Sequence, residues 1–287
     1  MTYRTRELGY ELFPLSEHTG VEARGVDLSR PLDEEIRLAL NRVFVERSVL
    51  VVRDQTMTAT QLRDGVRNFG EIFPQHNTRF ALPECPEIHY LSNQDRYPDG
   101  SRYIPGAGYH TDHSNSEMPP KATLLLAIKL PDTGGDTQFV NMAAAYDALP
   151  EATKERIVDL KAMHVYQSKH SARKLMDLTN EAKKNVPKAV YHPIVRTHPE
   201  SGRKTIYINP IRIAAIDGLE EADALNLLNE LLQHATQEQF QYRHKWRLGD
   251  LVIWDNRCLL HKANGDYDHE TQCRYLYRVM LQGDRPF

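Results

Sequence analysis

His110, Asp112 and His261 are the residues that most constrain how this chain can fold. Residues i and i+2 of a β-strand project to the same side, so His110 and Asp112 can contact one ion. On such a strand, Thr111 and His113 point the other way. His261 follows His110 by 261 − 110 = 151 residues, so the fold must bring two distant segments together. Two histidines and one carboxylate are the ligand set of a non-haem Fe(II) site with open coordination positions, and we predict such a site here.

The composition is that of an ordinary globular protein, with 40% hydrophobic and 26% charged residues. A formal net charge of −3 gives no basic surface for nucleic acid or for a membrane. No apolar run approaches the roughly 20 residues that span a bilayer, and the N-terminus lacks the apolar segment of a signal peptide. Three scattered cysteines suit a reducing compartment. We therefore expect a cytoplasmic protein with no nucleic-acid or membrane partner.

The first third of the chain has mixed helical and strand patterns. Apolar residues recur at helical spacing after Asp33, and residues 48–52 predict a short buried strand. Thr58 and Gln61 have the spacing of a capping box that begins a second helix. At 287 residues, the chain could form two small domains or one large β-rich domain.

Strand patterns dominate from about residue 104 onward. We expect strands at 122–129, 137–140, 194–197, 205–208, 251–254 and 275–281. Helices are expected at 153–160 and at 221–235, the second with a buried stripe of Leu225, Leu228, Leu231 and Leu232. Short strands separated by turns favour a sandwich or barrel, and metal ligands on two distant strands favour a cupin-like jelly roll. We therefore predict a mainly β fold with flanking helices, a double-stranded β-helix.

Two arginines near the C-terminus are candidate anion-binding residues. A facial triad leaves about half of the iron coordination sphere open, and one large enzyme class fills it with 2-oxoglutarate. The far carboxylate of that molecule needs a cation. Arg274 and Arg278 are four residues apart on one face of a predicted strand, so both can face one cavity. Guanidinium groups suit the task because they bind carboxylates through two hydrogen bonds. The alternative is a pair of surface arginines.

Several motifs occur in an order that resembles a known family. They are Phe69-Gly70-Glu71, His110-Thr111-Asp112, Gly134-Gly135-Asp136-Thr137, Val195-Arg196-Thr197-His198-Pro199, Trp254-Asp255-Asn256-Arg257-Cys258-Leu259-Leu260-His261 and Arg274-Tyr275-Leu276-Tyr277-Arg278. This combination resembles the taurine dioxygenase and phenoxyacetate-herbicide dioxygenase family of Fe(II)/2-oxoglutarate enzymes. The resemblance covers nearly the whole chain, so we expect one domain over residues 1–287.

The resemblance assigns roles to particular positions. It implies that His110, Asp112 and His261 bind Fe(II), with 2-oxoglutarate and O₂ as cosubstrates. Thr137 and Arg274 match the residues that hold the 2-oxoglutarate carboxylate. Family members commonly form dimers or tetramers, so a homo-oligomer is expected. The carboxylate of Asp112 implies a hydroxylase, because related halogenases have a small residue there.

The substrate is left open by departures from the family pattern. Arg278 matches the arginine that receives the sulfonate or carboxylate of the substrate in relatives. Gln75 stands where taurine enzymes have a substrate-binding histidine, and His76 is one residue later. The segment after the central strand differs and adds an arginine. Secondary candidates for contacts to a small anionic substrate are Gln75, His76, Asn209, Arg212 and Tyr109, although Arg212 can equally be a surface charge and Tyr109 a core residue.

The predicted function is hydroxylation of a small anionic molecule. The substrate classes are a sulfonate, a sulfate ester or a carboxylate, such as taurine or an aryloxyalkanoate. Hydroxylation of a carbon that bears oxygen, sulfur or nitrogen would also cleave that C–X bond. Two alternatives stay open. A zinc hydrolase would use the same three ligands with a metal-bound water, and a non-catalytic cupin-type protein would only bind a small acid.

Overall fold

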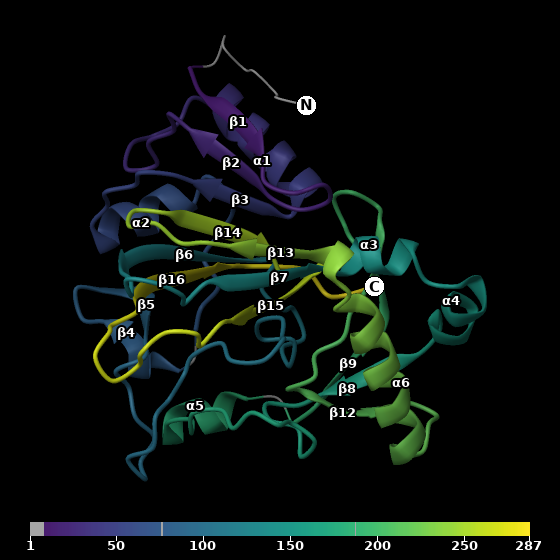
Figure 1. The fold of residues 1–287 in the computed structure, drawn as a ribbon. Coiled ribbons are helices and arrows are strands. Elements are labelled where there is room, and N and C mark those ends of the chain that lie inside the picture. Colours follow the sequence, from purple (N-terminus) through teal and green to yellow (C-terminus); the bar gives the residue numbers. More distant parts are fainter. Residues whose placement is uncertain (1–8, 76, 187) are drawn as a thin grey trace.

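Figure 1 shows the computed structural model of the protein, which describes residues 9–75, 77–186 and 188–287. Within these residues the largest sheet has eight strands. In order across the sheet they are Glu11–Pro14 (β1), Val21–Arg24 (β2), Val49–Val52 (β3), Leu251–Asp255 (β14), Ala122–Lys129 (β6), Tyr275–Leu281 (β16), Cys85–Ser92 (β5) and Ala81–Leu82 (β4). All neighbouring pairs of this sheet are antiparallel except β2 and β3.

Three smaller sheets complete the β structure of the described residues. One has the order β13-β7-β15, with bounds Gln241–His244, Thr137–Asn141 and Leu259–Ala263. The second has the order β12-β8-β9, with bounds Ile213–Ile216, Lys161–His164 and Val190–Pro193. The third pairs Val195–Thr197 (β10) with Lys204–Ile206 (β11). Figure 1 shows β13, β7 and β15 lying alongside the strands of the large sheet.

The central strands β3 and β14 of the large sheet are buried on both faces, and β3 shows the consequence for its sequence. Leu50 and Val52 pack in a hydrophobic cluster with the first two helices, whereas Val49 and Val51 pack in a cluster with Phe139 of β7. A strand buried on both faces has a continuous apolar sequence instead of alternating apolar and polar residues. The second cluster holds the large sheet against the β13-β7-β15 sheet, and the site described below lies between them.

The helices lie around the sheets. Their bounds are Glu34–Arg47 (α1), Ala59–Val66 (α2), Met142–Asp147 (α3), Glu151–Ile157 (α4), Asn180–Asn185 (α5) and Glu221–Ala235 (α6), with short 3-10 turns at Thr78–Phe80 and Glu238–Phe240. The capping box predicted for α2 is present: the Thr58 hydroxyl accepts from the backbone N–H of Gln61, and the Gln61 side chain accepts from the backbone N–H of Thr58.

The sheets and the surrounding helices together confirm the predicted mainly β fold with flanking helices.

The buried face of α6 differs from the predicted one. Its fully buried residues are Ala224, Leu227, Leu231 and Ala235. Leu228 and Leu232 are only partly buried at the edge of the same cluster, and Leu225 is outside it. The predicted stripe therefore missed Leu227 and the two alanines, and it shares only Leu231 with the buried face. The helix expected at 153–160 is α4, which begins and ends earlier than predicted.

His261 lies on a separate strand from the apolar run 251–254, for which a strand was predicted. That run is β14 of the large sheet, and the chain then turns at 256–258 and continues as β15 of the small sheet. His261 therefore belongs to a different sheet from the run that precedes it.

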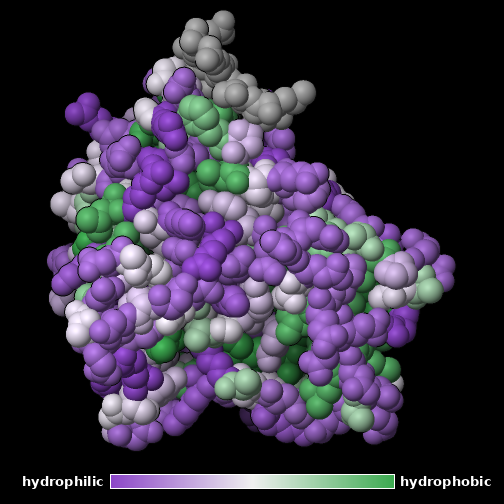
Figure 2. All heavy atoms as spheres, in the orientation of Figure 1, coloured by the Kyte–Doolittle hydropathy of each residue, from purple (hydrophilic) through white to green (hydrophobic). Residues whose placement is uncertain are grey.

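Figure 2 shows one face of the molecule, on which hydrophilic residues cover most of the surface and hydrophobic residues form separate patches. The exposed large hydrophobic residues are scattered along the chain, at Leu38, Met118, Ile128, Val158, Tyr191, Leu248 and Phe287. Across the described part of the chain, no helix combines the length and the apolar character needed to cross a bilayer.

Candidate metal centre and its cavity

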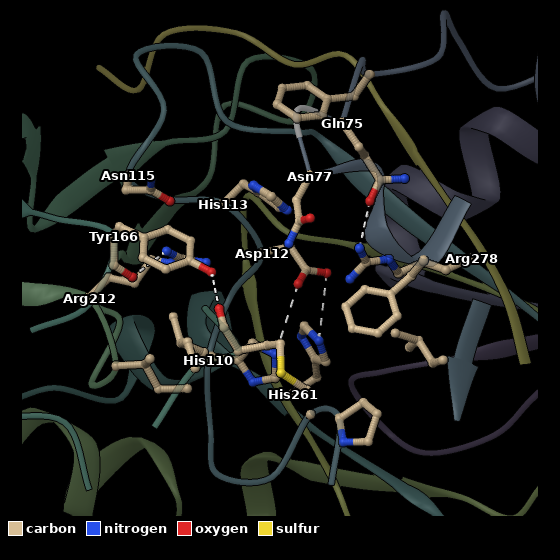
Figure 3. A pocket seen from close by; sticks show the side chains of 18 of the residues that line it. Gln75, Asn77, His110, Asp112, His113, Asn115, Tyr166, Arg212, His261 and Arg278 are labelled. Atoms are coloured by element: carbon tan, nitrogen blue, oxygen red, sulfur yellow. Dashed lines mark hydrogen bonds and ion pairs between the residues drawn. The ribbon is translucent and has the colours of Figure 1, made fainter. Parts of the chain in front are cut away.

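The side chains of His110, Asp112 and His261 converge on one point. One ligand atom from each lies within 4.8 Å of the others. The Nε2 atom of His110 is 3.9 Å from Asp112 Oδ1, and the Nε2 atom of His261 is 3.7 Å from Asp112 Oδ2. These separations are too long for hydrogen bonds, and they suit three donors arranged around one ion. Figure 3 shows the three groups facing one another at the centre of the cavity.

The register of the small sheet fixes both histidines. His110 forms an isolated antiparallel bridge with His261 of β15, in which each backbone N–H donates to the other carbonyl, at 3.0 and 2.8 Å. Residues directly opposite in an antiparallel pair project to the same side of the sheet. The two imidazole rings accordingly lie 4.2 Å apart, centroid to centroid.

Asp112 is positioned by a turn instead of by a strand. The chain turns at Asp112, and His113 has a left-handed backbone with φ of 45°. His113 lines the cavity and its ring lies 5.7 Å from that of Phe73, so the prediction that it faces away is wrong. The alternation of a β-strand stops where the turn begins, and side chains beyond that point no longer follow it.

Hydrogen bonds orient the carboxylate of Asp112. The hydroxyl of Thr123 on β6 donates to Asp112 Oδ2 at 2.6 Å. Asn256, in the turn after β14, donates from Nδ2 to Thr123 Oγ1 at 2.9 Å and accepts at Oδ1 from the Trp254 indole at 3.1 Å. These bonds hold Asn256 in the turn that leads from β14 to β15. The sequence did not point to Thr123, because a threonine inside an apolar strand carries no signal of its own.

The electrostatics of the three groups match a metal-binding donor set. Burial lowers the pKa of His261 to about 4 and that of His110 well below its usual range, so both imidazoles are neutral near pH 7. Burial alone would raise the pKa of Asp112, but the neighbouring His261 and His110 hold it below its usual range. The His110 Nδ1 atom lies 2.9 Å from the Gly108 carbonyl, an arrangement that leaves Nε2 free to act as a ligand. Neutral imidazoles and an ionised carboxylate fit Fe(II).

A cavity of about 350 Å³ opens above the triad, a volume suited to a small molecule. Its polar lining includes His110, Asp112, His261, Thr137, Arg274, Arg278, Gln75, Arg173 and Arg212. Its apolar lining includes Phe73, Phe80, Tyr103, Leu125, Met176, Ile211 and Trp254. Residues from β7, β14, β15 and β16 thus meet in one space, although they are far apart in the sequence.

Arg274 is a buried guanidinium at one side of this cavity. Its Nε donates to the Gly135 carbonyl at 2.8 Å, and its Nη2 donates to Thr137 Oγ1 at 3.4 Å. The Trp246 indole also donates to Thr137 Oγ1, at 3.0 Å. No carboxylate of the described residues pairs with Arg274, and burial lowers its pKa to about 10. A buried cation without a counterion is ready to receive an anion.

Gly134 and Gly135 make room for this arrangement. Both have a left-handed backbone, with φ of 76° and 69°. A Cβ on Gly134 would lie 2.3 Å from the Asp266 carbonyl oxygen, and a Cβ on Gly135 would lie 3.2 Å from Arg274 Cδ. The Gly-Gly pair of the motif is therefore required by close approach as well as by backbone conformation.

Three of the predicted substrate-contact residues, Gln75, Arg278 and Arg212, line the cavity. Gln75 and Arg278 line the cavity together, and Arg278 Nη2 donates to Gln75 Oε1 at 2.5 Å. Arg212 also lines the cavity and is only 9% exposed, so it is not a surface charge. Arg274 and Arg278 are likewise not surface residues of a charged C-terminus, because both line the cavity. His76 lies outside the described residues.

Two predicted contact residues lie outside the cavity lining. Asn209 is buried behind it, where its Nδ2 donates to the Thr111 carbonyl at 2.7 Å and to Ser114 Oγ at 2.8 Å. It therefore holds the loop that carries Asp112. The Tyr109 hydroxyl donates to Gln241 Oε1 at 3.0 Å, and its ring packs against the cluster under α6. Tyr109 follows the alternative of a core residue, so its proximity to His110 in the sequence does not make it a substrate contact.

Sequence and structure comparisons agree with this architecture. The family model described as "Taurine catabolism dioxygenase TauD, TfdA family" matches residues 11–280. An alpha-ketoglutarate-dependent 2,4-dichlorophenoxyacetate dioxygenase of Cupriavidus pinatubonensis is 37% identical over 257 residues, covering 85% of this chain and 88% of the relative. An alpha-ketoglutarate-dependent sulfate ester dioxygenase of Pseudomonas putida is 32% identical over 286 residues, covering 97% and 91%.

Solved structures show the same likeness. A taurine dioxygenase from Burkholderia xenovorans has a TM-score of 0.81 and 31% identity, covering 97% of this chain and 91% of that one. The structure of AAD-2 in complex with Mn(II) and N-oxalylglycine has a TM-score of 0.80 and 31% identity, covering 96% and 98%. The chain therefore belongs to the TauD/TfdA family. It is an oxidoreductase of the 2-oxoglutarate (alpha-ketoglutarate)-dependent dioxygenase class.

Proposed function

We propose that the protein uses Fe(II), 2-oxoglutarate and O₂ to hydroxylate a small anionic organic molecule. The observation that carries this proposal is that the triad of His110, Asp112 and His261 and the buried cation of Arg274 line one cavity. A zinc hydrolase or a simple acid-binding protein would have no need for both features together. The family to which the chain belongs supports the same conclusion.

His110, Asp112 and His261 are proposed to hold the iron. Their convergence, the neutral state of both imidazoles and the fixed Nε2 of His110 support this role. Bound iron and 2-oxoglutarate would together activate O₂, with one oxygen atom entering succinate as CO₂ is released and the other entering the substrate. The protein supplies orientation and charge: Thr123 holds the carboxylate of Asp112, and the bridge between the two histidines holds their rings.

Arg274 and Thr137 are proposed to bind the far carboxylate of 2-oxoglutarate. Arg274 is held in place by the Gly135 carbonyl, and its remaining N–H groups are free of any carboxylate of the described residues. Thr137 Oγ1 accepts from the Trp246 indole, which directs its own hydrogen toward another acceptor. A charged partner and a hydroxyl donor on one wall suit a carboxylate.

Arg278 is proposed to receive the acidic group of the substrate. It lines the cavity beside the triad, and its Nε is buried without a hydrogen-bond partner among the described residues. Gln75 orients the guanidinium by accepting from Nη2. Relatives named for 2,4-dichlorophenoxyacetate, (S)-phenoxypropionate and sulfate esters support an aryloxyalkanoate, a sulfate ester or a sulfonate as the substrate class. Hydroxylation of an ether or ester carbon would give a product that collapses with C–O cleavage.

The remaining parts of the proposal concern the whole molecule. The small β13-β7-β15 sheet and the large sheet enclose the site between them, which supports a double-stranded β-helix, or jelly roll, within one domain of residues 1–287. Cys85, Cys258 and Cys273 are free thiols, which supports a cytoplasmic location. A homo-oligomer, dimer or tetramer, is supported by the family resemblance.

A substrate panel tests the proposal. The panel contains aryloxyalkanoates, alkyl sulfates, sulfonates, phosphonates and amino-acid derivatives, with succinate release as the readout in the presence of Fe(II), 2-oxoglutarate and O₂. We expect stimulation by members that carry one acidic group close to an oxidisable carbon. Stimulation by neutral or cationic compounds alone would contradict the assignment of Arg278.

A further inference from the structure

Arg212 is a second buried cation in the cavity that the proposed reaction does not use. It directly precedes β12, and its Nη1 donates to the Tyr166 carbonyl at 2.6 Å. Its guanidinium carbon lies 5.2 Å from the centroid of the Tyr166 ring. No aspartate or glutamate of the described chain pairs with it, since the neutral carbonyl and ring of Tyr166 are its contacts.

Arg173 lines the same cavity and has even fewer contacts. Its Nε and Nη1 are buried and have no hydrogen-bond partner among the described residues. Burial lowers the pKa of Arg212 to about 10. Tyr166 and the carboxylate of Asp112 act against this shift, and the nearby charge of Arg173 acts with it. Arg173 as a whole is only partly buried, but two neighbouring cations that repel each other at a cavity wall are stabilised when an anion joins them.

The position of Arg212 separates it from Arg278. Figure 3 shows Arg212 and Arg278 on opposite sides of the triad, with Tyr166 beside Arg212 and Gln75 beside Arg278. Arg274 is bound to Gly135 and Thr137 and serves 2-oxoglutarate in the proposed function. A substrate with one acidic group at Arg278 would place no anion beside the cations on the other side of the triad.

We propose that Arg212 and Arg173 form a second anion subsite, and that the substrate carries an acidic group at each end. One group would face Arg278, the other would face Arg212 and Arg173, and the attacked carbon would lie between them near the triad. This inference rests on the proposed function and narrows its substrate class to a molecule with two anionic groups. Tyr103, Met176 and Ile211 line the same cavity, so the body of the substrate is hydrophobic or aromatic.

Binding measured without turnover tests the second subsite. Calorimetric titrations would use protein loaded with Fe(II) and 2-oxoglutarate under anaerobic conditions, so that the 2-oxoglutarate site is filled. The ligands are phenoxyacetate and its 3-carboxy, 4-carboxy and 4-carboxymethyl derivatives, each compared with the primary amide of the added group. Acid and amide have the same shape, so their difference reports the added charge. We expect at least one acid to bind about ten- to hundredfold more tightly than its amide.

Three variants locate the effect. Arg212→Met and Arg173→Met each remove one guanidinium while keeping a long side chain, and each should reduce the preference for acid over amide to about threefold or less. Two variants are used so that a folding defect in one leaves the other as a test. Arg156→Met is the matched control, because Arg156 pairs with Glu230 on the surface, and it should retain the full preference.

The possible outcomes separate this inference from the proposed function. If phenoxyacetate binds and none of the acids binds better than its amide, the second subsite is wrong and the proposed function stands. A preference that persists in both Arg212→Met and Arg173→Met also overturns the subsite. If no member of the series binds at all, aryloxyalkanoates are not the substrate and this inference, which names an aromatic dianion, falls, whereas the proposed function is then tested by the sulfate esters and sulfonates of the panel.

Discussion

His110 and His261 are joined by two backbone hydrogen bonds, of 3.0 and 2.8 Å, although many residues of chain separate them. This pairing extends the β13-β7-β15 sheet by one residue and sets both imidazoles on the same side. The chemistry of the candidate metal centre therefore depends on the register of a small sheet as much as on the identity of its ligands.

Replacement of His110 or His261 should abolish iron binding, whereas replacement of the neighbouring His113 should not. We expect His110→Ala and His261→Ala to lose stoichiometric Fe(II) when purified anaerobically, because each removes one of three protein ligands. His113→Asn should retain iron, because His113 is not part of the convergent triad and asparagine tolerates its left-handed backbone. A colorimetric assay of the iron content of each purified variant tests this prediction. Loss of iron in His113→Asn with retention in His110→Ala would refute the ligand set.

Arg274→Leu should weaken 2-oxoglutarate binding without removing the metal site. Hydrogen bonds to charged groups contribute about 1.5–3 kcal/mol, so the KM for 2-oxoglutarate should rise about ten- to hundredfold. Thr137→Val should act in the same direction and less strongly. Initial rates at varied 2-oxoglutarate measure both effects. An unchanged KM in Arg274→Leu would show that this arginine serves another purpose.

Gly135→Ala should damage both stability and 2-oxoglutarate binding. The left-handed backbone costs a non-glycine residue about 1–2 kcal/mol, and the added Cβ would also press on Arg274. Gly202→Ala is the matched control, because Gly202 has φ of 71° and open space where a Cβ would be. Urea unfolding should show a loss of about 1–2 kcal/mol for Gly202→Ala, with an unchanged KM, and a larger loss for Gly135→Ala, with a raised KM. Equal behaviour of the two variants would contradict the close-approach argument for Gly135.

Stability should fall as the pH is lowered below about 6.5. Burial lowers the pKa of His192 to about 4 and that of His89 to about 3, while an unfolded histidine titrates near 6.5. Between these values the unfolded chain binds more protons than the folded one, so stability rises with pH there. Each histidine contributes a slope of about 1.4 kcal/mol per pH unit within its window.

Urea unfolding at several pH values between about 4.5 and 7 measures this slope. This range covers most of the interval between the pKa of His192 in the folded protein, about 4, and that of an unfolded histidine, about 6.5. His192→Gln should lower the slope, and His18→Gln, which changes an exposed side chain, should leave it unchanged. The same slope in wild type and His192→Gln would mean that the folded protein accommodates a protonated His192.

The sequence predicted the parts of the site that depend on local spacing. The side chains of His110 and Asp112 do converge, although a turn instead of a strand places Asp112, and Arg274 and Arg278 do line one cavity. The capping box at Thr58 is likewise a local pattern. Residues that reach the site only through long-range packing could not be predicted from local spacing. Thr123 resembles any other strand residue, yet it holds Asp112.

Arg212, Asn209 and Tyr109 show where sequence reasoning reached its limit. The sequence around Arg212 left open whether its side chain is a surface charge or a substrate contact, and the structure buries it beside Tyr166. Asn209 and Tyr109 are close in space to the metal strand but bond to the loop and the sheet behind it. His113 was misplaced because the strand rule was applied past the turn at Asp112.

Oxygen uptake coupled to succinate formation tests the central claim most directly. Wild-type protein supplied with Fe(II), 2-oxoglutarate and an aryloxyalkanoate should consume O₂ and form succinate in equal amounts, and the omission of either Fe(II) or 2-oxoglutarate should stop both. His261→Ala should show neither. Substrate hydrolysis by Zn(II)-loaded protein without O₂ uptake, or O₂ uptake that His261→Ala retains in full, would contradict the account.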